Sequence, residues 1–488
     1  MEVTNLFVSK KNESFIQVTC DGAIDQELSE YFAFFVPGYK FQPLFKSGSW
    51  DGKIRLYDRR YKSLPFGLCG HLQKFATDRQ YSILFDDAVL LTTNYSVAEA
   101  KAFADSLKLP VEPHDYQLNA FVKAIRNRRL LIVSPTASGK SLIMYLIVRQ
   151  LQQNHHKGLI IVGTTSLVEQ LYKEFKDYGW QADKFVHRIY SGKEKRSDLF
   201  LTISTWQTLH TLPPEYMKQF DFVIGDEAHQ HKAKSLSTIL ANLSNADVRV
   251  GTTGTLDGTK THQLVLEGHF GPVFAPVSTK ELMDSGKLAQ LKIKCLVLKY
   301  PTEVCQSHKK STYQEEYEAV ISYPPRAKFI HNLAVSLEGN TLILFQLVKK
   351  HGQPMFETIR DGVAEGRQVF FVHGGVETMD REEIRRITEI STNAIIVASY
   401  GTFSTGINIK NLHNVIFAAP SKSRIRNLQS IGRGLRKADG KTHVTLFDVV
   451  DDMRIGKHEN FLLQHYVQRA GIYNSEKFTF QQYFIDLK

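Results

Sequence analysis

The stretch Ser134-Pro-Thr-Ala-Ser-Gly-Lys-Ser141 determines how the rest of the chain is interpreted. It follows an apolar run, residues 130–133, that is typical of a buried parallel strand. It precedes a second apolar run, residues 142–148, that is typical of a core helix. A strand, a loop ending in Gly-Lys-Ser and a helix form the layout of a nucleotide phosphate-binding loop. The backbone N–H groups of such a loop and the positive end of its helix face an anion.

The polar residues of this loop predict the ligands that it binds. We expect Lys140 to reach the β- and γ-phosphates of ATP, and the Ser141 hydroxyl to bind Mg²⁺. The usual pattern begins with Gly, whereas this chain has Ser134, so a turn before a core helix remains the structural alternative. The residues predicted to line the phosphate site are Ser134, Pro135, Thr136, Ala137, Ser138, Gly139, Lys140 and Ser141.

Length and composition limit the classes of protein to be considered. A chain of 488 residues is too long for one core and predicts two or three domains. Its net charge of +11 favours a polyanion partner, most often nucleic acid, although a generally basic surface is the alternative. The four cysteines form no C-x-x-C pair, which argues against zinc and fits a reducing compartment. No signal peptide or membrane-spanning run is recognisable, so we expect a cytoplasmic protein without a membrane partner.

The first 95 residues predict a small basic α+β domain. Residues 15–20 and 81–85 have the pattern of strands, and Asp25 is expected to cap a helix that runs to Phe35. In residues 38–62, cations alternate with aromatic rings, a combination that suits phosphate contacts and base stacking. A half-exposed sheet whose aromatic residues form its core explains the same pattern equally well. The candidate nucleic-acid contacts are Lys53, Arg55, Arg59 and Arg60.

The remainder of the chain alternates short apolar strands with helices, which predicts parallel sheets covered on both faces. Two α/β domains of similar kind are expected, at residues 96–288 and 289–488, and only the first carries a phosphate loop. Ser96-Val-Ala-Glu99 and Ser166-x-x-Glu169 each have the form of a capping box at a helix start. The predicted strands are residues 159–162, 199–203, 220–225, 248–251, 291–298, 341–345, 369–372, 394–398, 415–417 and 444–447.

Asp226-Glu-Ala-His229 follows one of these strands and supplies the partner that the phosphate loop needs. We expect Asp226 to hold Mg²⁺, directly or through water, and Glu227 to orient and deprotonate the attacking water. We expect His229 to relay the state of the γ-phosphate to neighbouring segments. An acidic strand-to-helix turn is common by itself, but it rarely accompanies a Gly-Lys-Ser loop by chance.

The second α/β domain contributes a basic helical stretch, Gln429 to Arg436. Arg433 and Arg436 are three residues apart and therefore share a helix face. Two guanidinium groups on one face can neutralise charge on a transferring phosphoryl group. A basic surface helix is the alternative, and the absence of an obvious arginine finger in the first domain favours the catalytic interpretation.

Taken in order, these motifs resemble those of superfamily two helicases, which carry two tandem RecA-like domains. The set comprises Gly139-Lys-Ser141, the DEAH box at residues 226–229, Thr253-Gly-Thr255, residues 405–408 and residues 429–436. More narrowly, the chain resembles the UvsW-type recombination and repair helicases of T-even-like phages. This narrower resemblance rests on features of the N-terminal module, on the run Thr205-Trp-Gln-Thr208 and on residues 397–406.

The resemblance implies roles for further residues. It assigns Gln117 to adenine recognition, Thr164, Thr205 and Thr402 to the nucleic-acid backbone, and Thr253 and Thr255 to the link between hydrolysis and movement. Gly406 and Asn408 fall where the second domain meets the nucleotide, although many relatives carry Asp at the latter position. Arg433 and Arg436 match the arginine fingers. The implied substrate is branched DNA, namely forks, four-way junctions and R-loops.

Three functions are compatible with these motifs. The first is a branched-DNA helicase in recombination, repair and replication restart, with fork regression and branch migration as outcomes. The second is an RNA helicase or remodeller, which shares every motor motif. The third is a non-enzymatic binding or annealing protein, against which the intact Lys140, Asp226, Glu227 and Arg436 argue. The motor subunit of a restriction system is a further alternative, but we find no nuclease cluster in the sequence.

Overall fold

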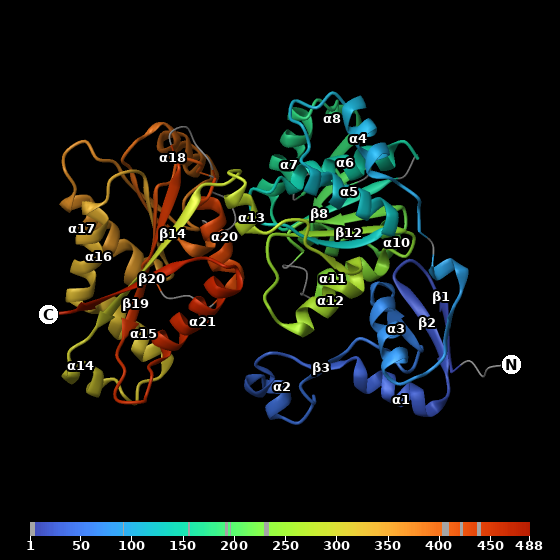
Figure 1. Cartoon of the computed structure of the whole chain (residues 1–488), viewed down its shortest axis with the longest axis horizontal. Helices are drawn as coiled ribbons and strands as arrows, with labels where there is room; N and C mark the ends of the chain where they lie inside the picture. The colour runs from blue at the N-terminus through green and yellow to red at the C-terminus, as the bar shows by residue number, and fades with distance from the viewer. Residues whose placement is uncertain are drawn as a thin grey trace. The chain divides into compact units, whose positions relative to one another are not determined.

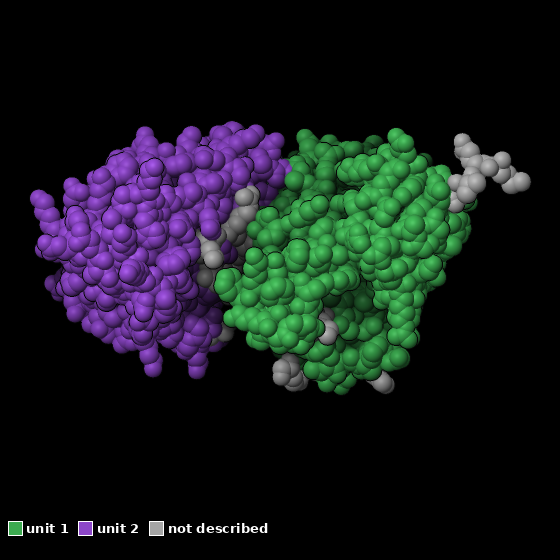
Figure 2. All heavy atoms as spheres, turned by 90° about the horizontal axis from the view of Figure 1, so that it is seen from below, with its two compact units in different colours: residues 1–134, 139–276 green, residues 135–138, 277–488 purple. Residues whose placement is uncertain are grey.

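The computed structural model describes residues 5–90, 92–154, 157–190, 194–195, 197–228, 234–402, 409–419, 423–436 and 441–488 (Figure 1). The chain divides into two compact units, shown in different colours in Figure 2. The first unit contains residues 1–134 and 139–276, and the second contains residues 135–138 and 277–488. Among the described residues, no helix is both long and apolar enough to cross a membrane.

A four-stranded sheet with two helices forms the N-terminal module. In sheet order its strands are β5 (Ser63–Pro65), β2 (Phe15–Cys20), β1 (Leu6–Lys10) and β6 (Ile83–Phe85). The helices α1 (Gly22–Tyr31) and α3 (Cys69–Asp78) supply core side chains, among them Leu28, Leu72 and Phe75. Both predicted strands are present.

The first helix differs from its prediction. Its cap is Asp21, whose carboxylate accepts a hydrogen bond from the Ile24 backbone N–H, and the helix ends at Tyr31. Asp25 lies one turn further on, where it accepts a hydrogen bond from the Tyr57 hydroxyl at 2.6 Å. The chain then turns into an arm made of β3 (Ala33–Phe35), η1 (Tyr39–Phe41), α2 (Pro43–Lys46) and β4 (Lys53–Arg55). The prediction was wrong here because pairing between β3 and β4 ends the helix early.

A seven-stranded sheet forms the centre of the first α/β domain, and each of its strand pairs is parallel. In sheet order the strands are β13 (Val273–Phe274), β7 (Arg129–Val133), β12 (Val248–Thr253), β11 (Phe222–Gly225), β8 (Gly158–Val162), β10 (Leu201–Thr205) and β9 (Val186–Ile189). Alternate residues of a strand face opposite sides of a sheet. Leu130 and Ile132 accordingly join one core and Leu131 joins another, so both faces are covered as predicted.

Two sets of helices cover this sheet. One core involves α4 (Val97–Ser106), α5 (Asp115–Asn127), α6 (Lys140–Gln152) and α7 (Thr165–Asp177). The other involves α9 (Trp206–His210), α10 (Pro214–Met217), α11 (Lys234–Asn242) and α12 (Lys260–Phe270). The capping box at Ser96 is confirmed, but α7 is capped by Thr164 rather than Ser166. The second cap was mispredicted because the Thr164 hydroxyl, two residues earlier, accepts the hydrogen bond from the Leu167 N–H and the helix begins at Thr165.

The second unit has its own seven-stranded sheet, again with parallel pairs throughout. In order the strands are β16 (Val369–Val372), β17 (Ile395–Ser399), β15 (Thr341–Phe345), β18 (Asn414–Phe417), β19 (His443–Asp452), β14 (Gln290–Lys299) and β20 (Phe480–Asp486). Its helices are α13 (Thr279–Asp284), α14 (Thr302–Ser307), α15 (Tyr313–Ser322), α16 (Pro324–Ser336), α17 (Gln353–Gly362), α18 (Thr378–Ile390), α20 (Arg424–Gly434) and α21 (Phe461–Ser475). The predicted arrangement of two tandem RecA-like parallel sheets after a small N-terminal domain is confirmed.

The N-terminal module is docked on the first α/β domain by polar contacts that are partly or fully buried. The turn between β1 and β2 carries Glu13, whose carboxylate accepts a hydrogen bond from Arg129 at 2.7 Å. Arg249 on β12 is 1% exposed and donates to the Ser14 hydroxyl at 2.7 Å. Arg129 and Arg249 lie at the beginnings of the strands that lead to Ser134 and to Thr253. The module is therefore joined to the two strands that carry the phosphate loop and the Thr-Gly-Thr segment.

Candidate nucleotide site and nucleic-acid interface

The phosphate loop lies between β7 and α6, as its sequence predicted. The backbone N–H of Ser134 donates to the Thr253 carbonyl at 2.9 Å, and the Lys140 ammonium donates to the Ser134 carbonyl at 3.3 Å. Ser134 is completely buried, so the first position accommodates a side chain here in place of the usual glycine. Ala137 (φ +67°) and Gly139 (φ +76°) adopt left-handed backbone conformations. These bonds and turns fix the loop ahead of the positive end of α6.

Gln117 lies beside this loop, which fits its predicted place in the nucleotide site. It is the third residue of α5, and its side-chain oxygen accepts a hydrogen bond from the His114 N–H at 2.8 Å. A Cβ atom on Gly139 would lie only 2.3 Å from the Gln117 amide nitrogen. The positive φ and the approach of the Gln117 side chain both favour glycine at position 139.

Asp226 and Glu227 directly follow β11 and lie in the same site as Lys140. The Asp226 carboxylate accepts a hydrogen bond from the Thr252 hydroxyl at 2.7 Å. Burial, together with the neighbouring Glu227 carboxylate, raises the pKa of Asp226 to about 6, while the Lys140 ammonium opposes this rise. The three charged side chains that the sequence assigned to catalysis in the first domain are thus close enough to interact.

Glu227 has a backbone φ of +49°, in the left-handed region that non-glycine residues seldom occupy. Such conformations cost on the order of 1–3 kcal/mol and persist where the surrounding structure enforces them. They cluster at active sites. The same conformation occurs at residues outside the site, such as Gln80 and Lys477, and at Glu227 it turns the chain directly after Asp226.

The side chains at this site fit Mg²⁺. A hard divalent cation prefers carboxylate and hydroxyl oxygens, which Asp226 and Ser141 provide. Desolvation and the neighbouring Glu227 carboxylate raise the pKa of Asp226, and a bound cation would offset both effects. The Ser141 hydroxyl lies 3.0 Å from the hydroxyl of Tyr178, a residue that sequence reasoning did not single out.

The three threonines expected at the nucleic-acid backbone occupy the ends of strands or the starts of helices. Thr164 caps α7 and Thr205 caps α9 through their side-chain oxygens. The Thr402 hydroxyl accepts a hydrogen bond from Ser399 at 2.8 Å. Thr205 and Thr402 are only 5% and 6% exposed, so these two hydroxyls serve local structure first. Gln207 joins two of these loops by donating to the Gly163 carbonyl at 3.2 Å.

The basic stretch of the second unit lies largely in α20, so the predicted helix is present, but it ends at Gly434 and Arg433 and Arg436 do not share a helix face. Arg433 lies in its last turn and Arg436 lies just beyond its end. The Lys441 ammonium, which the sequence did not reveal, donates to the carbonyls of Gly434, Arg436 and Lys410 at 2.5, 2.8 and 3.0 Å. All three donors of this buried ammonium are therefore satisfied at the end of the helix. Gly406, Asn408 and His229 lie outside the described residues.

The aromatic residues of the N-terminal module are divided between its core and its surface. Tyr57 is 2% exposed and belongs to the core, whereas Phe41 on the arm is 82% exposed. Arg55 pairs with Asp51 at 2.5 Å and Arg59 pairs with Asp25 at 3.0 Å. Lys53 lies 4.9 Å from the ring centre of Phe35, and Arg60 lies 5.4 Å from that of Tyr61. The module thus presents cations beside rings on its surface and uses other rings in its core.

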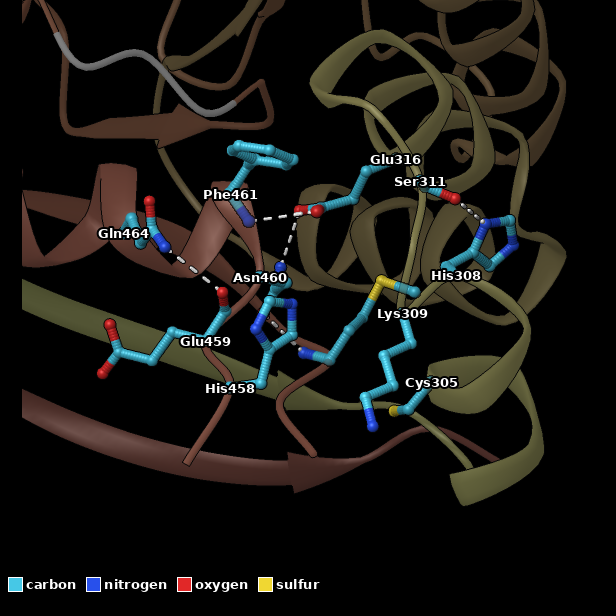
Figure 3. Close-up of a pocket in the computed structure, with 11 residues that line it drawn as sticks. Cys305, His308, Lys309, Ser311, Glu316, His458, Glu459, Asn460, Phe461 and Gln464 are labelled. Atoms are coloured by element: carbon cyan, nitrogen blue, oxygen red, sulfur yellow. Dashed lines mark hydrogen bonds between the residues drawn. The ribbon is translucent and has the colours of Figure 1, made fainter. Parts of the chain in front are cut away.

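A pocket in the second unit lies among residues that no helicase motif includes (Figure 3). Glu316 occupies its centre and caps α21 by accepting hydrogen bonds from the backbone N–H groups of Phe461 and Leu462 at 3.0 and 2.8 Å. The Asn460 side chain donates to the same carboxylate at 2.7 Å. The polar groups at the centre of this pocket are therefore committed to holding α15 against α21.

A phosphate loop and an acidic pair at the carboxyl edge of the first of two tandem RecA-like sheets define the class of P-loop ATPase motors. Three family models match the chain. They are DNA helicase UvsW, N-terminal, over residues 6–86, Type III restriction enzyme, res subunit, over residues 110–258, and Helicase conserved C-terminal domain over residues 326–438.

Comparison with individual proteins narrows the class. The chain is 36% identical to the ATP-dependent DNA helicase uvsW of Enterobacteria phage T4 over 490 residues, which cover 96% of this chain and 97% of the relative. The crystal structure of T4 UvsW aligns over 99% of this chain and all of its own, with 34% identity and a TM-score of 0.54. A putative HsdR subunit fragment from Vibrio vulnificus shares the fold, with 20% identity, a TM-score of 0.57 and coverage of 78% and 71%. The chain belongs to the UvsW family of DNA helicases.

Proposed function

We propose that this chain is an ATP-dependent DNA helicase and translocase that remodels branched DNA in recombination, repair and replication restart. The observation that carries the proposal is the convergence of Lys140, Asp226 and Glu227 at the carboxyl ends of β7 and β11. Substrates of parallel α/β sheets bind at this edge. Membership of the UvsW family supports DNA as the polymer, and the T4 relative is itself described as an ATP-dependent DNA helicase.

We assign the steps of hydrolysis to the residues of the first motor domain. Gln117 would read the adenine, residues 134–141 would hold the phosphates, and Ser141 and Asp226 would hold the Mg²⁺ that neutralises phosphate charge. Glu227 would accept the proton of the attacking water. Arg433 and Arg436, with Gly406, would complete the site from the second motor domain when ATP is bound.

The N-terminal domain is assigned to substrate selection. Its arm exposes Phe35, Phe41 and Leu44 at 50%, 82% and 60%. An exposed ring beside lysines can stack on an unpaired base at a branch point while the cations contact phosphates. Lys53, Arg55, Arg59 and Arg60 would contribute to this binding, although the ion pairs of Arg55 and Arg59 reduce their share. Because these contacts read no base edges, binding should depend on structure and salt rather than on sequence.

Translocation would use loops on both motor domains that contact the nucleic-acid backbone in alternation. We divide the chain into a substrate-binding domain at residues 1–95 and two motor domains at residues 96–288 and 289–488. Thr164 and Thr205 belong to the first motor domain, and Thr402 belongs to the second. Since the side chains of Thr205 and Thr402 are buried, their loops would contact phosphates mainly through backbone N–H groups. Thr253 and Thr255 would link hydrolysis to this movement.

For this function we expect three nucleic-acid forms as partners: duplex, single-stranded and branched DNA, with RNA when it lies in an RNA–DNA hybrid. The expected protein partners are single-strand-binding or recombination proteins. If the chain is phage-encoded, as the T4 relative is, its place of action is the host cytoplasm. An RNA helicase with the same motor is the competing function. Unwinding assays with matched four-way DNA junctions and RNA duplexes separate the two. We expect ATP-dependent unwinding of the junctions, and activity confined to RNA would refute the proposal.

A further inference from the structure

We propose that Thr252 and Tyr178 are positioning residues that orient Asp226 and Ser141, the two side chains expected to hold Mg²⁺. Neither residue belongs to the set that the helicase motifs assign to the site. The inference rests on the proposed function, because it concerns the same ATP–Mg²⁺ site. The Thr252 and Tyr178 hydroxyls would not bind the metal themselves. They would act on it only through Asp226 and Ser141, the side chains that they contact.

Thr252 is placed by the register of the sheet. It lies on β12 beside Ile132 of β7, and its predecessor Gly251 lies beside Gly225 of β11. Its hydroxyl is completely buried and donates to Asp226 Oδ1 at 2.7 Å. A carboxylate with one oxygen held in this way cannot rotate freely, so its orientation toward the phosphate loop is fixed before any ligand arrives.

Tyr178 reaches the site from a different element. It follows the last residue of α7, and its ring lies 5.2 Å from the ring centre of Tyr145 on α6. Its hydroxyl oxygen is 3.0 Å from Ser141 Oγ. A serine oxygen that binds a cation keeps its proton, and that proton needs an acceptor on the side away from the metal. The Tyr178 oxygen lies at the distance that such an acceptor requires, and the packing against Tyr145 holds it there.

The two contacts together hold both predicted ligands by hydroxyl groups of the same domain. Partners of this kind set the direction of a metal ligand, and their removal typically costs 10–100-fold in metal affinity or activity. The expected loss is therefore specific to Mg²⁺. Binding of the nucleotide without metal depends on the loop backbone and on Lys140, which neither hydroxyl contacts.

The experiment measures binding of a fluorescent ADP to the full-length chain as Mg²⁺ is added, with a parallel titration in EDTA. Thr252→Val and Tyr178→Phe remove one hydroxyl each at nearly constant volume. We expect the Mg²⁺ concentration at half-saturation to rise about 10-fold in each variant, with affinity in EDTA unchanged. Thr252→Ser restores the hydroxyl and should behave like the wild type.

Tyr95→Phe is the matched control, because its hydroxyl bonds Gln150 at 2.9 Å in the same domain. The inference is overturned if Thr252→Val and Tyr178→Phe keep the wild-type Mg²⁺ dependence, or if they weaken binding equally in EDTA, as a general structural defect would. A wild-type chain whose nucleotide binding ignores Mg²⁺ would instead contradict the proposed function. The two failures are therefore distinguishable.

Discussion

At the scale of single residues, the nucleotide site combines groups that the sequence identifies with groups that it does not. Lys140, Asp226 and Glu227 follow from short motifs with a fixed geometry, and the structure brings them together. Tertiary structure creates the contacts of Thr252, Tyr178 and Lys441. Along the chain, their hydrogen-bond partners lie 26 residues, 37 residues and between 5 and 31 residues away, respectively. No local pattern distinguishes such residues from an ordinary strand threonine, a helix-end tyrosine or a surface lysine.

Lys140→Ala and Glu227→Gln are expected to abolish ATP hydrolysis, because one removes the phosphate cation and the other removes the proton acceptor. Loss of a general base alone costs typically 10²–10⁴-fold. DNA binding should stay within about 3-fold of the wild type, since neither residue belongs to the proposed DNA-contacting surface. Steady-state ATPase assays and fluorescence anisotropy with a junction measure the two properties. Parallel loss of DNA affinity in both variants would refute this separation of roles.

At the scale of elements, apolar runs predicted most strands of both motor sheets. Residues 130–133 and 341–345 match β7 and β15 closely, because strands buried on both faces are continuously apolar. The edge strand β20 (Phe480–Asp486) went unpredicted because two glutamines interrupt its apolar residues, so it lacks the continuous apolar run of a buried strand, and its side chains are mostly exposed. The arm of the N-terminal domain was also missed, because strands of three residues leave no periodic pattern.

The strand β19 carries the acidic member of a buried ion pair. Asp448 and Arg469 are both completely buried and pair at 2.9 Å, and Tyr473 donates to the same carboxylate at 2.9 Å. Removing one partner of such a pair leaves an uncompensated charge, so Asp448→Ala should destabilise the second unit by about 3–5 kcal/mol. Chemical denaturation measures this free energy of unfolding.

The control for this prediction is the double replacement Asp448→Leu with Arg469→Met, which removes both charges. Because the desolvation cost disappears together with the attraction, this variant should lose much less stability than Asp448→Ala. Equal losses in the two variants would show that volume, rather than the unpaired charge, dominates at this position.

At the scale of the whole molecule, the chain combines a helicase motor with a small N-terminal domain, to which we assign substrate selection. The N-terminal domain is tied to the first motor domain through Glu13, Ser14 and the His71–Glu267 pair. The sequence predicted both its basic character and the tandem sheets, but not this docking, which depends on side chains far apart in the chain. Through these contacts at the starts of β7 and β12, the N-terminal domain forms one compact unit with the first motor domain.

Neutralising the N-terminal cations tests the role of this domain. A variant with Lys53, Arg55, Arg59 and Arg60 changed to Gln should bind junctions more weakly and with a smaller salt slope, by at most about 0.9 per lost phosphate contact. Its ATPase without DNA should persist, because the four residues lie outside the nucleotide site. Unchanged junction affinity across a salt titration would show that these cations form only a solvated surface.

The central claim is that hydrolysis at Lys140, Asp226 and Glu227 is driven by branched DNA. The most direct measurement is the ATPase rate of the wild-type chain with equal nucleotide concentrations of four-way junction DNA, single-stranded DNA and RNA, using Glu227→Gln as the blank. The account predicts stimulation by DNA, strongest with the junction, and none in the blank. Stimulation by RNA alone, or a rate that no nucleic acid changes, would contradict it.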